Sequence, residues 1–366
     1  MRILILANTD SGLYHFRYEL LTELCKEHEV FVSLPQGKYI GEFEALGCTF
    51  IRTDFKRRSI NPFHDLTLLR CYRHILKKVR PDAVLSYTIK PNIYGGIACR
   101  GRDIPFLPNV TGLGTAIESG GLLSRLLMFA YRSAFKKAHS IFFQNANNLE
   151  RLRRVIPTNT RVRLIPGSGV NLDRFTVKAY PSPDEPIRFL FIGRVMRNKG
   201  IEELMEAMKA LKEEFPSTSL DILGRCDENY QGLLQVMQDQ GTLRYHGRVD
   251  DVRPYIEASH CTVHPSYHEG MSNVLLESAA SGRPVIASRV PGCQETFDEA
   301  VSGFGCEAGD SISLLEAMRK FVKLPYEQKV AMGQAGRRKM EREFNRTLVI
   351  NAYIEELGSI TVRGEE

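Results

Sequence analysis

The chain has 366 residues, more than the roughly 250–300 that one hydrophobic core usually holds, so we expect two domains. Hydrophobic residues make up 43% and charged residues 25%, which excludes a disordered, collagen-like or coiled-coil chain. The net charge of +6 is unevenly spread, because residues 1–173 carry 25 Lys and Arg against 14 Asp and Glu, whereas residues 174–366 are net acidic. Anionic partners are therefore expected on the first half of the chain.

The eight cysteines contain no C-x-x-C pair and are too sparse for a disulfide scaffold, so we interpret them as reduced packing residues of a cytoplasmic protein. The first seven residues form an apolar run too short for a signal peptide. The longest apolar stretch, residues 122–138, is interrupted by four Lys and Arg, so no segment is long enough to span a bilayer. We expect a protein that is soluble or rests on the cytoplasmic face of a membrane.

Short β-rich runs alternate with helical patterns in the first half of the chain. This alternation predicts parallel βαβ units. The expected strands are residues 3–7, 30–34, 50–53 and 83–86, and the expected helices are residues 16–26, 39–46, 66–79 and 93–99. Turn residues at 165–171 and prolines at 181 and 183 then interrupt the pattern. We therefore place an N-terminal domain at residues 1–166 and a hinge at residues 167–186.

The same alternation resumes in the second half. The expected strands are residues 187–192, 219–223, 244–246, 261–264 and 284–287, and the expected helices are residues 200–215, 230–240, 273–281, 313–322 and 326–344. A second domain at residues 187–344 follows, and a C-terminal helix and tail at 345–366 are expected to pack back on the first domain. The predicted fold class is α/β, with two doubly wound parallel-sheet domains that face each other across a cleft and bind ligands at the carboxyl ends of their strands.

Residues 266–277 are the most informative window. The pattern predicts a strand end, a loop of small residues, and a helix that begins near Ser272 or Asn273. A helix N-terminus with free N–H groups is suited to a diphosphate. Glu269 and Glu277 are unsuited to phosphate but suited to sugar hydroxyls, from which carboxylates accept hydrogen bonds. Alternatively, Glu269 caps the helix and Glu277 lies on a solvated face.

A second window, residues 189–200, predicts a buried strand, a short loop and the start of a helix. Arg194 and Lys199 lie where cations would meet a phosphate at the carboxyl end of a sheet. Taken alone, these two residues are better explained as exposed loop cations.

Together these windows resemble the retaining glycosyltransferases of family 4, which have the two-domain GT-B fold, and the resemblance covers essentially the whole chain. Residues 169–175 are similar to the hinge segment of that family, although Asn171 stands where many members have Asp. Five N-terminal segments resemble the branch that acts on undecaprenyl-diphosphate-linked saccharides, which includes N-acetylgalactosaminyltransferases and capsule and O-antigen transferases. These segments are residues 14–17, 35–37, 59–63, 90–92 and 112–114.

The resemblance implies transfer of a hexose or N-acetylhexosamine, with GalNAc or GlcNAc as the best choice, from a UDP-sugar to a polyprenyl-diphosphate-linked sugar. It implies retention of configuration without a protein nucleophile, and it implies no cofactor. The catalytic residues that it implies are Glu269, Arg194, Lys199 and His15. The implied donor-binding residues are Gly193, Arg225, Val249, Gly270, Met271, Ser272, Asn273 and Glu277. On the acceptor side they are Tyr14, Arg17, Lys90, Asn92 and Thr111.

The sequence has no Asp-x-Asp motif, so we expect cations and helix termini, without a metal ion, to stabilise the leaving diphosphate. His15 follows the expected turn at residues 8–12 and is therefore expected near the cleft. The later histidines at 246, 260, 264 and 268 do not have the spacing of a zinc site, and we assign them packing or solvent roles.

Basic clusters at 56–58 and 70–80 and the amphipathic segment 122–132 suit the anionic inner leaflet of a membrane. The alternative is that Leu126, Leu127 and Phe129 pack in the core. No nucleic-acid-binding motif is present, so we expect no nucleic acid partner. Two other functions remain open at this point: a UDP-sugar 2-epimerase of the same fold, and a catalytically silent protein that binds the donor.

Overall fold

The computed structural model describes residues 1–55, 62–113 and 121–360. The chain forms two compact units: one comprises residues 1–168 and the C-terminal segment from Thr347, and the other comprises Gly169–Arg346. Most of the segment expected as a hinge, residues 169–186, is thus part of the second unit. The basic cluster at 56–58, residues 59–61 of one resemblance segment and Gly114 of another lie outside the described residues.

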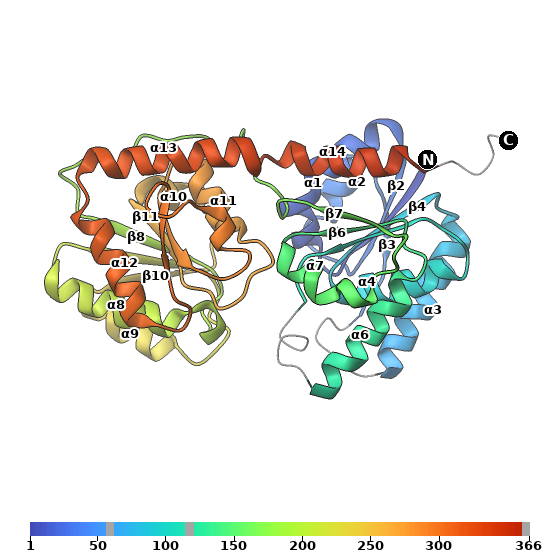
Figure 1. Cartoon of the computed structure of the whole chain (residues 1–366), viewed down its shortest axis with the longest axis horizontal. Helices are drawn as coiled ribbons and strands as arrows, with labels where there is room; N and C mark the ends of the chain where they lie inside the picture. Colours follow the sequence, from blue (N-terminus) through green and yellow to red (C-terminus); the bar gives the residue numbers. More distant parts are fainter. Residues whose placement is uncertain (56–61, 114–120, 361–366) are drawn as a thin grey trace. The chain divides into compact units, whose positions relative to one another are not determined.

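The first unit contains a parallel sheet of seven strands with helices on both faces (Figure 1). The strand order is β3-β2-β1-β4-β5-β6-β7. The strands are β1 Arg2–Leu6, β2 Glu29–Leu34, β3 Thr49–Arg52, β4 Ala83–Tyr87, β5 Phe106–Val110, β6 Ser140–Phe143 and β7 Arg161–Leu164. The helices are α1 Asp10–Glu27, α2 Ile40–Ala45, α3 Pro62–Val79, α4 Ile89–Arg100, α6 Gly121–Phe135, α7 Ala146–Leu152, η1 Arg153–Val155 and α14 Arg346–Gly358. Helices α1, α2 and α14 share one core cluster with the sheet, and α3 and α4 share another.

Three helices of this unit begin earlier than the sequence pattern predicts. Helix α3 begins at Pro62, four residues before its expected start. Helix α1 begins at Asp10, because Thr9 caps it by accepting a hydrogen bond from the Gly12 N–H. Helix α4 begins at Ile89, four residues before the expected start. Tyr14, His15 and Lys90 therefore lie on helices rather than in the expected loops.

The second unit contains a parallel sheet of six strands in the order β10-β9-β8-β11-β12-β13. The strands are β8 Arg188–Ile192, β9 Ser219–Leu223, β10 Leu243–Gly247, β11 Cys261–His264, β12 Val285–Ser288 and β13 Gly303–Cys306. The helices are η2 Arg197–Lys199, α8 Ile201–Glu214, α9 Gln231–Asp239, α10 Arg253–Ala258, α11 Asn273–Ala280, η3 Gln294–Thr296, α12 Ser311–Lys323 and α13 Tyr326–Glu343. Helices α8, α9 and α12 pack in one core cluster, and α10, α11 and α13 pack in a second one.

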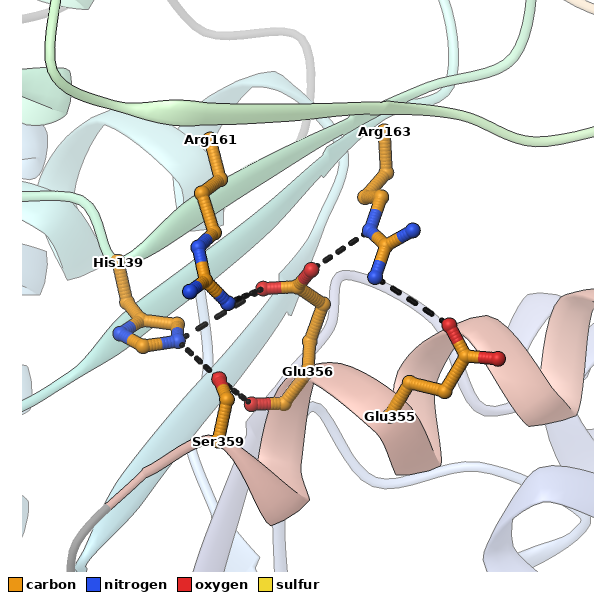
Figure 2. Close-up of polar contacts among 6 residues, drawn as sticks. All are labelled: His139, Arg161, Arg163, Glu355, Glu356 and Ser359. Atoms are coloured by element: carbon orange, nitrogen blue, oxygen red, sulfur yellow. Dashed lines mark hydrogen bonds and ion pairs between the residues drawn. The ribbon is translucent and has the colours of Figure 1, made fainter.

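Helix α14 is anchored to the first unit by aromatic packing and by a buried carboxylate. Tyr353 is fully buried, stacks on Phe142 at 4.2 Å and accepts a hydrogen bond from the Asn109 side chain. Figure 2 shows that Glu356, also fully buried, points toward the edge strand β7, where Arg163 Nε donates to its Oε1 at 2.6 Å. His139 and Arg161 lie 3.7 and 4.0 Å from Oε2. These contacts join residues between 193 and 244 positions apart in the sequence.

Helix α6 presents apolar side chains to solvent. Leu122, Leu126 and Phe129 are 75%, 58% and 73% exposed, so the alternative that Leu126 and Phe129 pack in the core is wrong. Leu127 does pack against the core. Among the described residues, no helix is long and apolar enough to cross a membrane.

Candidate functional site

The second sheet reverses its strand order between β8 and β11, which are parallel neighbours. Loops that follow the two central strands at such a point diverge and leave room for a ligand at the carboxyl edge. Here those loops are residues 193–200 and 265–272, the two windows that the sequence singled out. The two loops touch at Gly200. Its backbone has φ +69, and an added Cβ would lie 2.1 Å from the Pro265 carbonyl oxygen, so this close approach requires glycine. The Tyr267 N–H also donates to the Asn198 carbonyl at 3.1 Å.

Glu269 is the centre of a charged cluster at this edge. Its Oε1 accepts hydrogen bonds from Lys199 Nζ and from His264 Nε2, the latter at 2.8 Å. The side chains of Lys199 and Glu269 are only 17% and 16% exposed, and that of His264 is 2% exposed. Burial opposes ionisation of Glu269, but the His264 hydrogen bond and the Lys199 charge outweigh burial and lower its pKa to about 2. Glu269 is therefore a well-held carboxylate.

His264 is buried, and the packing or solvent role predicted for it did not include a contact with Glu269. The residue ends β11, and its side chain is directed at Glu269 five positions later. The residue spacing does not predict this contact, because the contact forms only when the loop at residues 265–268 turns back over the end of the strand.

Helix α11 begins at Asn273, as predicted, with Ser272 as its N-cap. The Ser272 N–H donates to the Gly292 carbonyl at 2.8 Å. Ser272 Oγ and Asn273 Oδ1 are buried and have no hydrogen-bond partner among the described residues. Met271 is buried in the core cluster beneath the loop. Since Glu269 bonds Lys199 and His264, the alternative that it merely caps this helix is wrong.

Arg194 and Arg225, which follow β8 and β9, meet at one carboxylate that sequence reasoning missed. Arg194 Nη1 donates to Asp227 Oδ2 at 3.1 Å, and Arg225 Nε donates to Asp227 Oδ1 at 2.6 Å. The hydrogen bond from Arg225, followed by that from Arg194, holds the pKa of Asp227 below its usual value. Gly193 precedes this cluster at the end of β8, and its N–H donates to the Leu223 carbonyl at 2.9 Å. Val249 is partly buried against the core cluster of the same unit.

Glu277 lies one turn into α11 and is partly buried, so the alternative of a solvated face is wrong. Burial raises its pKa to about 7, although the charges of Arg346 and Arg174 act in the opposite direction. A carboxyl group that titrates near neutral pH can change its charge when a ligand binds.

The predicted acceptor-side residues lie in the first unit, and α1 contributes an aromatic group there. Tyr14 stacks on Tyr39 at 4.1 Å, and His15 meets the same ring edge-on at 5.4 Å. His15 Nε2 also lies 3.4 Å from the Tyr39 hydroxyl. Both Tyr14 and His15 are partly exposed.

Arg17 and Asn92, by contrast, are 4% and 1% exposed. The Arg17 guanidinium lies 5.0 Å from the centre of the Tyr87 ring, and Asn92 donates to the Asn109 carbonyl at 2.8 Å while accepting from Ser86. These contacts favour packing roles over the acceptor contacts expected for both residues. Arg17 lies on the inner face of a helix that begins six residues earlier than expected, and Asn92 joins α4 to two strands.

Lys90 and Thr111 are partly exposed at the carboxyl ends of β4 and β5. Lys90 forms an ion pair with Asp65 at 2.7 Å. The adjacent Thr88 has φ +74, which strains a β-branched residue, and sequence reasoning had no signal for it. Such strain is common at ligand sites.

Among the described residues, no group of three His, Cys, Asp or Glu side chains could hold a metal ion.

Two doubly wound parallel sheets, with a cation–carboxylate cluster where the second one reverses, are the architecture of the GT-B class of glycosyltransferases. Comparison with protein families agrees with this class. Residues 173–339 match the model "Glycosyl transferases group 1", and residues 2–145 match "Glycosyl transferase 4-like". The chain belongs to this family of glycosyltransferases and is an enzyme of that class.

Individual relatives act in bacterial glycan assembly. The chain is 28% identical to the N,N'-diacetylbacillosaminyl-diphospho-undecaprenol alpha-1,3-N-acetylgalactosaminyltransferase of Campylobacter jejuni, over 86% of this chain and 88% of that protein. It is 26% identical to the lipopolysaccharide core biosynthesis glycosyltransferase LpsE of Rhizobium meliloti, over 78% of each chain. Among solved structures, Anabaena HepE in complex with UDP and glucose matches with a TM-score of 0.78 at 16% identity, covering 98% of this chain and 100% of that one.

Proposed function

We propose that this enzyme transfers a hexose or N-acetylhexosamine, with GalNAc or GlcNAc as the best candidates, from a UDP-sugar to a polyprenyl-diphosphate-linked saccharide with retention of configuration. The observation that carries the proposal is the buried Lys199–Glu269–His264 cluster at the carboxyl edge of the second sheet. The activity of the Campylobacter relative supports the acceptor class, and the UDP in the HepE complex supports the donor class.

In the proposed donor complex, Lys199 and Arg194 contact the diphosphate, and the N–H groups from Gly270 to Asn273 add donors at the start of α11. Glu269, held as a carboxylate, accepts from hydroxyls of the transferred sugar. Glu277 accepts from the ribose hydroxyls. The uracil base contacts the loops at Arg225 and Val249.

Charge stabilisation is the main chemical task in this reaction. As the bond between the sugar and the diphosphate breaks, negative charge develops on the leaving phosphate. Lys199, Arg194 and the helix terminus supply hydrogen-bond donors near that charge, so they lower the barrier. We propose that the reaction needs no metal ion, and that the acceptor hydroxyl attacks from the face that the diphosphate leaves.

We further propose that the enzyme binds the inner face of the cell membrane and that helix α6 makes this contact. Leu122, Leu126 and Phe129 follow the i, i+4, i+7 spacing of one helix face and are exposed. The exposed cations Arg125 and Arg132 lie on the same helix, and Lys136 and Lys137 follow it. Apolar side chains beside cations match an anionic lipid surface, at about 1 kcal/mol per cation near the headgroups.

A donor panel tests the reaction. The purified chain is incubated with UDP-, GDP- and dTDP-sugars and a short polyprenyl-diphosphate-linked sugar, with and without EDTA, and nucleotide release and acceptor mass are followed. UDP release matched by an acceptor mass gain of one sugar, unaffected by EDTA, is the expected result. Conversion of a UDP-sugar to its epimer without acceptor modification contradicts transfer. Loss of activity in EDTA that magnesium or manganese restores contradicts metal independence.

Replacing Leu122, Leu126 and Phe129 together by Ser tests the membrane contact. Flotation with vesicles that contain anionic lipid should fall at least tenfold, while transfer to a short water-soluble acceptor stays unchanged. Leu233 and Val236 on α9, which are 47% and 51% exposed, provide the matched control, and their replacement by Ser should leave flotation unchanged. Equal flotation of the α6 variant and the wild type would contradict the assignment.

A further inference from the structure

His264 is fixed more firmly than a packing role requires. Its side chain is 2% exposed, and its ring lies nearly parallel to that of Phe191, with an interplanar angle of 19° and a centroid distance of 6.2 Å. Because Glu269 is ionised, its carboxylate can only accept hydrogen bonds, so the proton of the 2.8 Å contact lies on His264 Nε2.

The two donors to Glu269 converge on one atom. Lys199 Nζ and His264 Nε2 both bond Oε1, and among the described residues no hydrogen bond is made to Oε2. Oε2 therefore keeps its full capacity to accept hydrogen bonds from a ligand. The two donors differ in mobility, since the lysine ammonium ends a flexible chain, whereas the imidazole belongs to a buried strand residue.

We propose that His264 is a positioning residue, which holds Oε1 of Glu269 so that Oε2 faces the hydroxyls of the transferred sugar. The inference rests on the proposed function, in which Lys199 also contacts the donor diphosphate. When the ammonium turns toward the phosphate, Glu269 loses part of one hydrogen bond, and His264 keeps the carboxylate in place. Without His264, the carboxylate follows Lys199 and its orientation toward the sugar is lost.

A second buried histidine in the same unit provides the matched control. His260 is 3% exposed and precedes β11, and its Nδ1 accepts a hydrogen bond from the Arg188 N–H at the amino end of β8. It therefore lies at the opposite edge of the sheet from Glu269. Replacing His260 by Leu reproduces the loss of a buried, hydrogen-bonded imidazole without touching the cluster.

The experiment compares His264→Leu, His264→Gln and His260→Leu with the wild-type full chain. Calorimetry gives the affinities for UDP and for the UDP-sugar that the donor panel identifies, and steady-state assays give kcat, KM and their pH profiles. In His264→Leu, UDP affinity should stay within about threefold, whereas kcat should fall at least tenfold and the extra affinity for UDP-sugar over UDP should disappear. His264→Gln retains an N–H at the Nε2 position and should restore most of both, with the pH profile of the wild type.

Three results would overturn the inference. The first is a His264→Leu variant with wild-type kcat and donor preference. The second is a His264→Gln variant that is as impaired as His264→Leu or has a shifted pH profile, since either indicates a role beyond donating one hydrogen bond. The third is an equal loss of sugar recognition in His260→Leu, which indicates general destabilisation. Failure of the proposed function is distinct, because the wild type itself would then transfer no sugar to the acceptor.

Discussion

The carboxylate that anchors helix α14 permits a quantitative stability test. Glu356→Gln preserves the shape of the side chain and removes its charge, which weakens the 2.6 Å hydrogen bond from Arg163 (Figure 2). A hydrogen bond to a charged group contributes about 1.5–3 kcal/mol. Because Arg163 is 41% exposed and regains water when the contact weakens, we expect the lower part of that range, about 2 kcal/mol.

Hydrogen exchange of the α14 amides is the suitable assay, because a chain of two units need not unfold in one transition. A loss of about 2 kcal/mol corresponds to exchange about 30-fold faster. Glu355→Gln is the control, since Glu355 is 61% exposed and bonds the same arginine at 3.2 Å. Its effect should stay within about twofold, as expected for a surface ion pair. Equal exchange in both variants would refute the argument that burial of Glu356 gives the contact its strength.

Two further predictions concern the donor site. Lys199→Ala and Glu269→Gln should both reduce transfer steeply. Calorimetry should show UDP affinity falling about 10- to 100-fold only for Lys199→Ala, because UDP carries the diphosphate and lacks the transferred sugar. Equal losses of UDP affinity in the two variants would contradict these roles. Burial raises the pKa of Glu277 to about 7, so its carboxylate form is scarce at pH 6 and predominant at pH 8. The UDP affinity of the wild type should therefore rise about tenfold from pH 6 to pH 8. The UDP affinity of Glu277→Gln should not change over this range. A similar rise in Glu277→Gln would assign the titration to another group.

The strands and helices of the second unit follow closely from the sequence, because their periodicity is strong and their ends carry turn residues. Strands β9 and β11 have the predicted bounds, and the predicted helix start at Asn273 is confirmed. Strand β13 was missed, since two of its four residues are glycine. Strand β5 was missed because Pro108 reads as a strand breaker, although a parallel sheet accommodates it here beside Ser86.

Some contacts of the candidate site were also predictable from the sequence, and others were not. Residues on loops after central strands, such as Lys199 and Glu269, were found because the topology brings such loops together. His264 and Asp227 were missed, because each acts through a contact that depends on how a loop folds back. The burial of Arg17 and Asn92 was not predicted, because the sequence pattern does not show which face of α1 or of the first turn of α4 packs on the sheet.

The central claim is retaining transfer from a UDP-sugar to a polyprenyl-diphosphate-linked saccharide. It is tested most directly by the anomeric configuration of the product, determined by NMR after incubation of the full chain with an α-linked UDP-sugar and that acceptor. The account predicts an acceptor extended by one sugar in α-linkage. A β-linked product, or an unextended acceptor with every UDP-sugar, would contradict it.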